Sequence, residues 1–303
     1  MTLLMLCREP RLYSCQRLKQ AAEQQGISLD ILDPNRFLLK LQQGRFECFY
    51  HSGESYDKTR PEPVKLADYL GIIPRFGTSS TEMGCRVLNH YEQQGVAVLN
   101  NAQAFALARD KWQSLQRLVG SGIAVPDSLV MGELCGISAG IRHFSLPMIA
   151  KTLSGSQGVG VMLMEQSSTA QSVLETFKAV GVESLLQKFV AESKGEDLRA
   201  FVVGDQVVAA MRRYNTSGEF RANIHKGGSA EAVELSEVEK QLAIQATKAI
   251  GLDVAGVDLI RSEDETLVLE VNASPGLEMI EKVSQVDIAS LMIQQLLQKI
   301  PQN

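Results

Sequence analysis

The stretch VAGVDLIRSEDETLVLEVNASPG, residues 254–276, contains two apolar runs on either side of a short polar segment. Apolar runs that flank a polar turn predict an antiparallel hairpin. Glu270 and Asn272 are two positions apart, so a strand points both side chains to the same face. If residues 263–265 form a three-residue loop, Asp258 lies directly opposite Glu270. We therefore expect two carboxylates and an amide oxygen to meet on one face of this hairpin.

These three side chains have the chemistry of a metal site. Two carboxylates directly opposite each other in a sheet repel unless a cation neutralises them. Mg²⁺ prefers oxygen ligands that it shares with phosphate, so Asp258, Glu270 and Asn272 are candidate metal ligands. The alternative is a surface hairpin with solvated acids. The apolar neighbours VAGV and LVLEV disfavour that alternative, because an unpaired acid buried among them costs on the order of several kcal/mol.

A glycine-rich segment, KTLSGSQGVGV at residues 151–161, connects two short apolar runs. Its glycines Gly155, Gly158 and Gly160 allow the backbone N–H groups to wrap around anionic oxygens. Lys151 adds a positive charge suited to phosphate. The alternative is a plain connection between strands. Neither G-x-x-x-x-G-K-[ST] nor G-x-G-x-x-G occurs in the chain, which argues against a P-loop NTPase or a dinucleotide-binding Rossmann domain.

The segment LLQKFVAESKGEDLRAFVVG, residues 185–204, has a polar crossing between two apolar strands. The end of such a strand offers backbone donors and acceptors to an adenine edge, with apolar walls for the faces of the ring. Asp197 in this crossing is able to accept hydrogen bonds from ribose hydroxyls. The alternative is an ordinary connection between domains.

Cations are concentrated in the segment MRRYNTSGEFRANIHKGGS, residues 211–229. The basic side chains there are Arg212, Arg213, Arg221, His225 and Lys226. Such a cluster suits phosphate and carboxylate ligands. The alternative, a solvated basic loop, is less expected in a chain whose net charge is −5.

Composition excludes several classes of protein. The 303 residues are 45% hydrophobic and 21% charged, which is ordinary for a globular protein of two domains or three small ones. The negative net charge argues against direct binding of nucleic acid. The five cysteines have no metal-site spacing and indicate a reducing compartment. The N-terminal apolar run is too short for a signal or membrane segment, so we expect a cytoplasmic protein.

Hydrophobic periodicity predicts alternating strands and helices. The expected strands are 2–7, 27–33, 69–78, 96–100, 148–151, 159–164, 185–190, 198–204, 206–214, 254–261 and 266–272, with a small hairpin around 45–53. The expected helices are 14–25 with Ser14 as its cap, 81–94, 110–121 capped by Asp110, 168–180, 236–250 and 286–299. We expect an N-terminal α/β domain over 1–100, a central lobe over 101–190 and a strand-richer C-terminal lobe over 191–303.

The order of these segments resembles the ATP-grasp superfamily. The similarity is greatest to the RimK family, ligases that add glutamate to the C-terminus of a small-subunit ribosomal protein. The resemblance spans nearly the whole chain and is carried by LYSCQRLKQAA, IPRFGT, ARDK, KTLSGSQGVGV, DLRAFVVG, FRANIHKGG, VAGVDLIR and LEVNASPGLE. It implies an ATP-grasp fold of class α/β and α+β, in which an N-terminal α/β (pre-ATP-grasp) domain precedes two α+β lobes that clamp ATP.

The resemblance also implies roles for individual residues. The nucleotide contacts it implies are Lys111 and Lys151 at the phosphates, Lys188 and Phe189 at the adenine, and Asp197, Arg221, Ala222 and Asn223 elsewhere in the pocket. The metal ligands it implies are Asp258, Glu270 and Asn272. Related ligases often carry an acid where this chain has Lys188. That difference matters only if the side chain, and not the backbone, contacts the base.

The mechanism implied is peptide-bond formation through an acyl phosphate. The acceptor carboxylate attacks the γ-phosphate of ATP and releases ADP, and the amine of L-glutamate then displaces phosphate. Two Mg²⁺ or Mn²⁺ ions are expected, and Arg213, with Arg212 or Arg221 nearby, is expected to stabilise the oxyanion. The expected acceptor is the C-terminus of a ribosomal protein or a glutamate chain, and the expected assembly is a homo-oligomer such as a tetramer. The alternatives are a ligase for a small-molecule or carrier-protein acceptor and a non-catalytic nucleotide-binding regulatory module.

Overall fold

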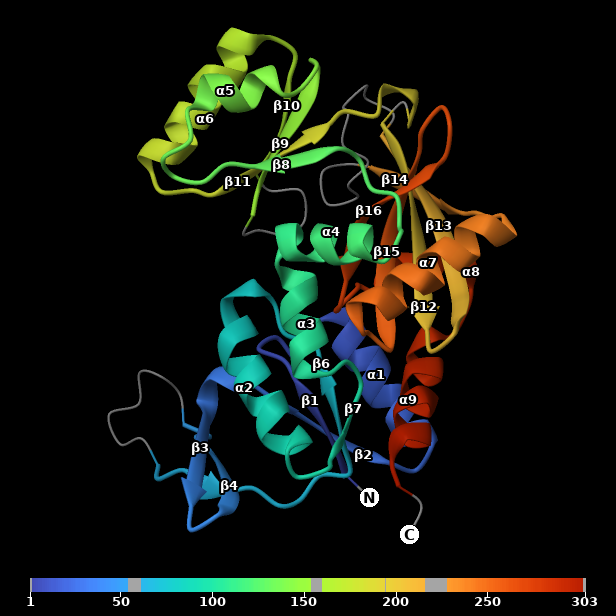
Figure 1. Ribbon diagram of the computed structural model, residues 1–303. Coiled ribbons are helices and arrows are strands. Elements are labelled where there is room, and N and C mark those ends of the chain that lie inside the picture. The colour runs from blue at the N-terminus through green and yellow to red at the C-terminus, as the bar shows by residue number, and fades with distance from the viewer. Residues whose placement is uncertain (1, 54–60, 154–159, 194, 216–227, 302–303) are drawn as a thin grey trace.

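The computed structural model describes residues 2–53, 61–153, 160–193, 195–215 and 228–301. These residues form four sheets (Figure 1). Two four-stranded sheets lie toward the ends of the molecule, and a five-stranded sheet lies between them in the ribbon (Figure 1). Within the described residues, no helix is both long and apolar enough to span a membrane.

The N-terminal sheet is parallel, with strand order β2-β1-β6-β7. Its strands are β1 (Thr2–Leu6), β2 (Ser28–Leu32), β6 (Gly71–Pro74) and β7 (Ala97–Val98). Helix α1 (Tyr13–Gln24) links β1 to β2, and α2 (Thr81–Glu92) links β6 to β7. Residues 3–6 of β1 are fully buried, as expected for a parallel strand covered on both faces. The strand order reverses between β1 and β6.

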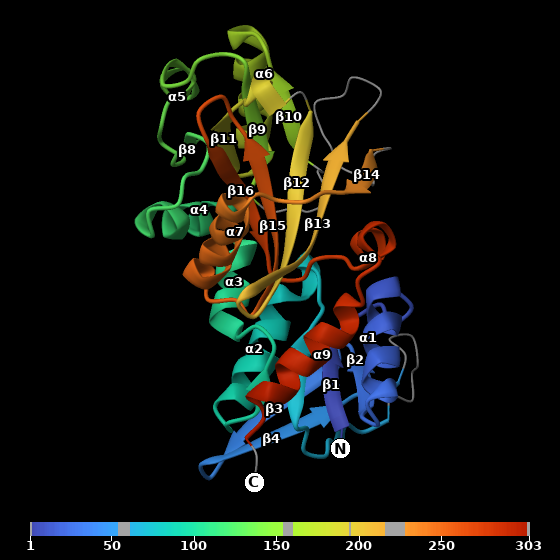
Figure 2. The same ribbon diagram turned by 90° about the vertical axis from the view of Figure 1, so that its right-hand side faces the viewer.

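A small antiparallel sheet extends from this domain. Its strands are β3 (Phe37–Gln42), β4 (Arg45–Tyr50) and β5 (Val64–Lys65), and the turn η1 (Pro34–Arg36) precedes it. After β6, the turn η2 (Thr78–Ser80) leads into α2. The C-terminal helix α9 (Ile288–Lys299) returns to pack beside α1, as Figure 2 shows. The two ends of the chain therefore share one core, which includes Leu18 and Ile293.

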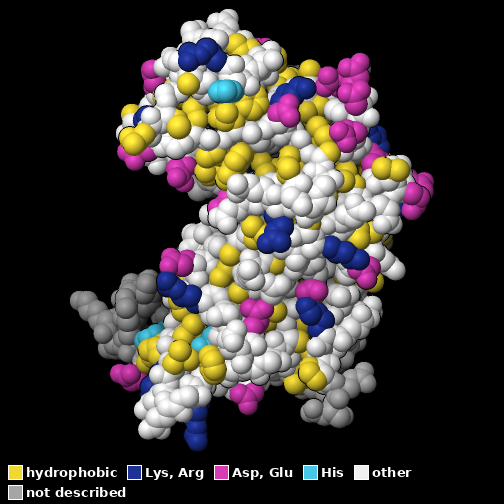
Figure 3. All heavy atoms as spheres, in the orientation of Figure 1, with side chains coloured by type: hydrophobic (Ala, Val, Ile, Leu, Met, Phe, Trp, Pro, Cys, Tyr) yellow, Lys and Arg dark blue, Asp and Glu magenta, His cyan; other side chains and the backbone are white. Residues whose placement is uncertain are grey.

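Two consecutive helices, α3 (Ala102–Arg109) and α4 (Lys111–Gly120), lead from the N-terminal sheet to the central lobe. Asp110 caps α4, since its carboxylate accepts from the backbone N–H groups of Trp112 and Gln113. The central antiparallel sheet has the order β10-β9-β11-β8. Its strands are β8 (Ser128–Val130), β9 (Met148–Thr152), β10 (Val161–Met164) and β11 (Ser184–Lys188). Helices α5 (Ile137–Arg142) and α6 (Ser167–Ala179) cover one face of this sheet. On the surface, a notch separates the central lobe from the rest of the molecule (Figure 3).

The five-stranded sheet contains the hairpin expected over residues 254–276. Its order is β14-β13-β12-β15-β16. The strands are β12 (Glu196–Val203), β13 (Gln206–Tyr214), β14 (Ser229–Ala232), β15 (Val254–Arg261) and β16 (Thr266–Asn272), and the turn η3 (Ala191–Ser193) precedes β12. Helix α7 (Glu237–Ile250) packs on one face through residues such as Ala243 and Ala246, and α8 (Glu278–Ser284) lies beside β13 and β14.

The expected class, α/β followed by α+β, is confirmed, and the long elements fall where periodicity placed them. The Ser14 cap is wrong, because α1 begins at Tyr13 and the Ser14 hydroxyl accepts from the backbone N–H of Leu277 at 3.0 Å. The hairpin loop is also longer than expected. Residues 262–265 form a four-residue loop, and a bulge between Asp258 and Leu259 restores the pairing of Asp258 with Glu270.

Candidate active site

One face of the five-stranded sheet carries a dense group of charged side chains. Residues directly opposite each other in an antiparallel sheet share a face. The pairings Arg213–Asp197, Arg199–Asp258 and Asp258–Glu270, together with Asn272 two positions after Glu270, therefore put six polar side chains on one face. We call Asp197, Arg199, Arg213, Asp258, Glu270 and Asn272 the charged face. It is the face opposite α7, since Leu198 and Val257 point into the core with α7.

Asp258 lies at the centre of an arginine network. Arg199 donates to both of its carboxylate oxygens at 2.7 Å, from Nε and from Nη2. Arg213 donates from Nη2 to Asp258 Oδ2 at 2.9 Å and holds Asp197 in a bidentate pair at 2.6 and 2.7 Å. Each carboxylate is thereby neutralised by a neighbouring guanidinium in a geometry that favours strong, directional bonds. The expectation that Asp258 needs a charge partner is met here by two arginines.

The electrostatics of the network keep Asp258 ionised. Burial alone would raise its pKa, but the positive charges of Arg199 and Arg213 outweigh burial and lower the pKa to about 2. Burial would likewise lower the pKa of Arg213, yet the two carboxylates beside it raise that pKa above its ordinary value. Both groups are therefore charged throughout the physiological range.

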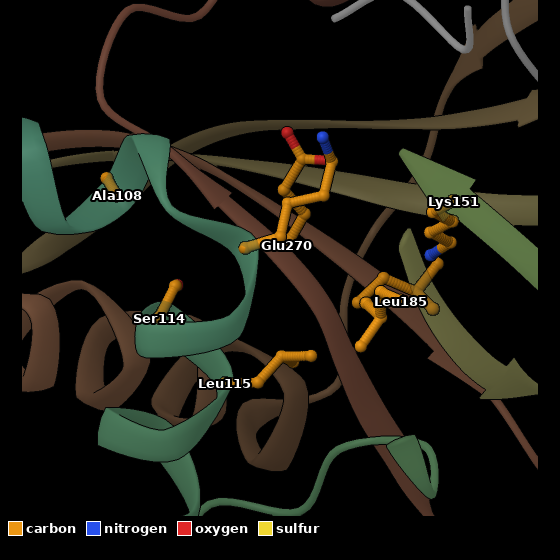
Figure 4. A pocket seen from close by; sticks show the side chains of 8 residues that line it. Ala108, Ser114, Leu115, Lys151, Leu185 and Glu270 are labelled. Carbon is orange, nitrogen blue, oxygen red and sulfur yellow. The ribbon is translucent and has the colours of Figure 1, made fainter. Parts of the chain in front are cut away.

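Two lysines, Lys111 of α4 and Lys151 of β9, line a pocket together with Glu270 of the charged face. This pocket is lined by Lys111, Lys151 and Glu270, and by Ala108, Ser114, Leu115, Leu185 and Leu269. These side chains come from α3, α4, β9, β11 and β16, so the pocket lies where the N-terminal helices, the central sheet and the five-stranded sheet meet (Figure 4). Glu270 is exposed into it. The three charged residues thus combine anion-binding and cation-binding groups around one space.

Each lysine is anchored by neutral acceptors. Lys151 Nζ donates to Gln187 Oε1 at 2.6 Å, and Gln187 in turn donates to the Ser128 hydroxyl. Lys111 Nζ donates to the carbonyls of Thr152 and Leu153 at 3.0 and 3.1 Å. Burial lowers the pKa of both lysines, and the carboxylate of Glu270 partly offsets that effect. Cations that are desolvated in this way gain from an anionic ligand in the pocket.

The glycine loop leaves β9 directly after these contacts. Gly160 has a φ of +75°, a region that favours glycine, and its carbonyl accepts from the N–H of Thr152 at 3.0 Å. A Cβ atom at Gly160 would lie 2.5 Å from the Thr152 hydroxyl. Gly155 and Gly158 lie outside the described residues, as do Arg221, Ala222, Asn223, His225 and Lys226.

Two other expected site residues, Arg212 and Lys188, point away from the site. Successive strand residues point to opposite faces, and Arg212 accordingly lies on the face away from Arg213, paired with Glu196 and Glu231. The expected placement of Arg212 beside Arg213 in the site is therefore corrected. Lys188 is exposed at the end of β11, on the strand face that alternation sets opposite Lys151. Its side chain thus points away from the pocket, while Phe189 next to it is half-buried.

The oxygen donors of the charged face suit a hard cation. Glu270 and Asn272 supply a carboxylate and an amide oxygen on the same face as Asp258. Both oxygens of Asp258 already accept from arginines, so direct ligation by Asp258 requires an arginine contact to give way. A trio of histidine, cysteine or acidic side chains arranged for a metal is not found among the residues described. The donor set therefore fits Mg²⁺ through Glu270 and Asn272 first, with Asp258 as the adjoining charge.

Three residues of this site were not among the candidates expected from the sequence. Arg199 stands two positions after Asp197, and the alternation of a strand is the signal that puts both on one face. Gln187 has no such signal, because a buried glutamine has no distinctive pattern. Asn100 is buried just after β7 and forms hydrogen bonds with the backbone of Val254 on β15 and of Ala273 after β16. Only the tertiary fold reveals these contacts.

Several solved structures share the fold of this chain. The chain aligns with the ATP-grasp ligase PsnB complexed with minimal precursor at a TM-score of 0.74 and 20% identity, covering 98% of each chain. It aligns with D-cycloserine synthetase DcsG at a TM-score of 0.71 and 18% identity, covering 99% of this chain and 100% of the other. The expected ATP-grasp fold is thereby confirmed.

The family follows from the sequence comparisons. The RimK PreATP-grasp domain model matches residues 1–105, and the RimK-like ATP-grasp domain model matches residues 108–296. The chain belongs to the RimK-like ATP-grasp family, and its enzyme class is ATP-grasp ligase. A protein named "Probable alpha-L-glutamate ligase" from Haemophilus influenzae (strain Rd) is 57% identical over 295 residues, 97% of this chain and 96% of that one. One of the same name from Pasteurella multocida (strain Pm70) is 57% identical over 301 residues, 99% and 95% of the two chains.

Proposed function

We propose that this protein is an ATP-dependent α-L-glutamate ligase that joins glutamate to an acceptor carboxylate through an acyl phosphate. The observation that carries the proposal is the meeting of Lys111 and Lys151 with Glu270 in one pocket, beside the buried network of Asp258. Phosphate transfer needs fixed positive charge at the phosphates and oxygen ligands for their cation, and this pocket offers both. The choice of glutamate is supported by the relatives that carry that name at 57% identity.

The lysines and the glycine loop form the phosphate side of the proposed site. Lys151 sits on β9 and Lys111 opens α4, where its ammonium already binds the carbonyls that begin the loop. An anionic phosphate is a stronger partner than those carbonyls, so Lys111 is able to exchange them for it. The loop glycines Gly155, Gly158 and Gly160 bring backbone N–H groups to the same phosphates. Lys188 and Phe189 border the adenine, and Lys188 does so through its backbone because its side chain points away.

Glu270 and Asn272 would hold the metal, proposed as two Mg²⁺ or Mn²⁺ ions, and Asp258 would join them as a ligand where an arginine contact gives way. When bound, the metal neutralises phosphate oxygens and so lowers the barrier to attack by a carboxylate. Arg199 keeps Asp258 oriented along β15. Asp197 holds Arg213 in a bidentate pair and so orients the guanidinium. Its oxygens have further lone pairs, and the proposal keeps Asp197 as a nucleotide contact.

Two steps complete the reaction. An oxygen of the acceptor carboxylate attacks the γ-phosphorus, the bond from that phosphorus to the β-bridging oxygen breaks, and ADP leaves. The glutamate nitrogen then attacks the acyl carbon, the C–O bond to phosphate breaks, and the departing phosphate takes up the proton that the amine gives up. Arg213 stabilises the oxyanion of the second step, and Arg221, Ala222 and Asn223 complete the nucleotide pocket in the proposal.

The acceptor, assembly and domain limits belong to the same proposal. We propose the C-terminus of a ribosomal protein or of a growing glutamate chain as acceptor, a homo-oligomer such as a tetramer, and cytoplasmic action. The proposed units are 1–100, 101–190 and 191–303. The competing acceptors are a small molecule and a carrier protein.

The test is ADP release by the purified protein with ATP, Mg²⁺ and L-glutamate, in the presence of each acceptor class in turn. The proposal expects ADP release that requires both glutamate and acceptor, and a product whose mass has grown by whole glutamyl residues. Equal rates with other amino acids in place of glutamate contradict the proposed substrate. Nucleotide binding without ADP release under all conditions supports the regulatory module instead.

A further inference from the structure

The N-terminal sheet also has a feature with the chemistry of a binding site, apart from the charged face and its pocket. In open parallel sheets, ligands bind outside the carboxyl ends of the strands, at the point where the strand order reverses. Here that point lies between β1 and β6. The residues that leave those two strand ends are Cys7 and Arg75, and the N–H of Arg75 donates to the carbonyl of Leu6 at 2.9 Å.

Arg75 has a positive charge with no carboxylate partner in the described part of the chain. Among the described residues, its guanidinium makes no hydrogen bond or ion pair, and the side chain is half-buried. Burial lowers the pKa of Arg75, and the ionisable groups that influence it further are the thiols Cys15 and Cys7 and a second cation, Arg109. A desolvated arginine without an acidic neighbour is costly unless a ligand supplies the anion.

Arg109 strengthens this positive region. Its Nη2 donates to the carbonyl of Phe76, the residue after Arg75, at 2.8 Å, and its guanidinium lies over the Phe105 ring. Its Nε is buried and has no hydrogen-bond partner within the described residues. Burial lowers the pKa of Arg109, and the carboxylate that most offsets this effect is Glu270 of the proposed active site. Arg109 binds the carbonyl of Phe76 at the edge of the N-terminal sheet, and its neighbour in the chain, Ala108, lines the active-site pocket.

Two hydrogen bonds fix this sheet edge against the end of β16. Asn100, just after β7, donates to the carbonyl of Ala273 at 2.8 Å, and Ala273 follows the candidate ligand Asn272. The hydroxyl of Ser14, at the start of α1, accepts from the N–H of Leu277 at 3.0 Å. The carboxyl ends of the N-terminal strands thus lie beside the chain segment that leaves the charged face. A substrate bound at β1 and β6 is therefore close to the site of chemistry.

We propose that Arg75, with Arg109 beside it, binds a non-reacting carboxylate of a glutamyl substrate at the carboxyl edge of the N-terminal sheet. The inference rests on the proposed ligase function and names the part of the site that selects an acidic substrate. An arginine fork matches a carboxylate in shape and charge. Free glutamate and an acceptor that ends in glutamate both present such a group, so the experiment separates these two sources.

The experiment combines a change in the protein with a change in the substrate. Arg75→Gln and wild type are assayed for ADP release with L-glutamate, L-glutamine and the α-amide of L-glutamate, and with acceptor peptides that end in glutamate or in glutamine. In wild type, one of the amide substrates lacks the carboxylate that Arg75 holds, and its KM is higher than that of the matching acid by roughly 10- to 100-fold, as expected for a lost charged hydrogen bond. In Arg75→Gln this difference in KM between amide and acid disappears, and in Arg75→Lys part of the difference is kept. The KM for ATP stays constant.

Two controls separate binding from folding. Arg117→Gln changes an exposed arginine of α4 and leaves every kinetic constant at the wild-type value. Arg75→Met, measured without substrates, keeps or raises the melting temperature, because the guanidinium has no hydrogen bond or ion pair to lose among the described residues. A structural arginine gives the opposite result.

The outcomes are distinct for the two proposals. If Arg75→Gln keeps the full preference for carboxylates over amides in both substrates, the carboxylate site is overturned while the ligase function stands. If wild type releases no ADP with glutamate and acceptor, the ligase function is overturned. In that case, calorimetric titration with L-glutamate decides the site: binding by wild type and not by Arg75→Gln supports it, and absence of binding to wild type overturns it.

Discussion

Arg213 and Asp258 are joined by a hydrogen bond of 2.9 Å between Nη2 and Oδ2, on neighbouring positions of the charged face. Arg213 also holds Asp197, and Asp258 also holds Arg199. The residue proposed to stabilise the oxyanion and a residue proposed to adjoin the metal therefore belong to one buried network. A change at either residue acts on both catalysis and stability.

Two carboxylate variants separate these effects. Asp258→Asn removes a buried charge and leaves Arg199 and Arg213 without their shared counter-ion, so it should lower the free energy of unfolding by about 3–5 kcal/mol. Glu270→Gln changes an exposed side chain and should alter the free energy of unfolding by no more than about 0.5 kcal/mol. Both should reduce ADP release by orders of magnitude at saturating Mg²⁺. Urea unfolding and steady-state kinetics measure the pair, and full activity in Glu270→Gln contradicts its role as a ligand.

Lys151 and Arg213 should affect different kinetic constants. Lys151→Met removes a charge that acts on ATP in the ground state as well as in the transition state, so the KM for ATP should rise. Arg213→Lys keeps a charge but loses the bidentate geometry, and kcat should fall by roughly a hundredfold if Arg213 donates to the oxyanion. Steady-state ADP release with ATP varied at saturating glutamate and acceptor measures both.

Arg212→Gln is the matched control for Arg213. It removes a neighbouring guanidinium from the opposite face of the same strand, so kcat should stay at the wild-type value. If Arg213→Lys changes only the KM for ATP, Arg213 is a nucleotide ligand and the proposed division of roles is wrong. If Arg212→Gln lowers kcat as strongly as Arg213→Lys, the effect is one of general charge.

Gly160 provides a test of the loop through its backbone. Gly160→Ala places a Cβ atom at a φ of +75° and within 2.5 Å of the Thr152 hydroxyl, so the turn must shift. Because Thr152 also bears the carbonyl that binds Lys111, the shift should raise the KM for ATP and cost about 1 kcal/mol of stability. Gly181→Ala, another glycine of positive φ, has open space around it and should cost stability alone. An unchanged KM in Gly160→Ala makes the loop a simple connection.

The sequence predicted the site best where one short segment contained the geometry. Asp258 and Glu270 are paired as expected, because strand alternation and a short turn fix which residues of a hairpin face each other. The correct pairing nevertheless arises from a four-residue loop and a bulge, two local departures that offset each other. Register at the site was thus predictable from a local pattern even though the loop was not.

Long-range partners could not be predicted in the same way. Arg199 on β12 donates to Asp258 on β15, a residue 59 positions further along the chain. Asn100 reaches Val254 and Ala273 over still greater separations. Neither contact leaves a periodic signal, since only the tertiary fold brings these segments together. Arg212 was expected in the site because it is next to Arg213 in the sequence. The two are successive residues of one strand, so their side chains point to opposite faces and only Arg213 lies on the charged face.

The last prediction concerns the helix that supports the charged face from behind. Glu239 completes the capping box of α7, whose N-cap residue is Ser236, because its carboxylate accepts from the N–H of Ser236 at 2.9 Å. The same carboxylate also accepts from Arg261 Nε at 2.7 Å. Burial opposes ionisation of Glu239, but the bonds from Arg261 and Ser236 outweigh it and hold its pKa below the ordinary value of 4.5. A carboxyl with a depressed folded pKa stabilises the protein above its unfolded pKa and loses that contribution as the pH falls through the folded value.

Glu239→Gln should therefore lower the free energy of unfolding by about 1–3 kcal/mol near neutral pH. The deficit should shrink as the pH falls below 4.5, because protonation removes the same charge from wild type. Urea unfolding of both proteins from about pH 7 down to about pH 4 measures the trend. Glu237→Gln is the control: its exposed ion pair with Lys240 should contribute less than about 1 kcal/mol at any of these pH values. A deficit in Glu239→Gln that stays constant with pH means that shape and packing, and not the carboxylate charge, stabilise this end of α7.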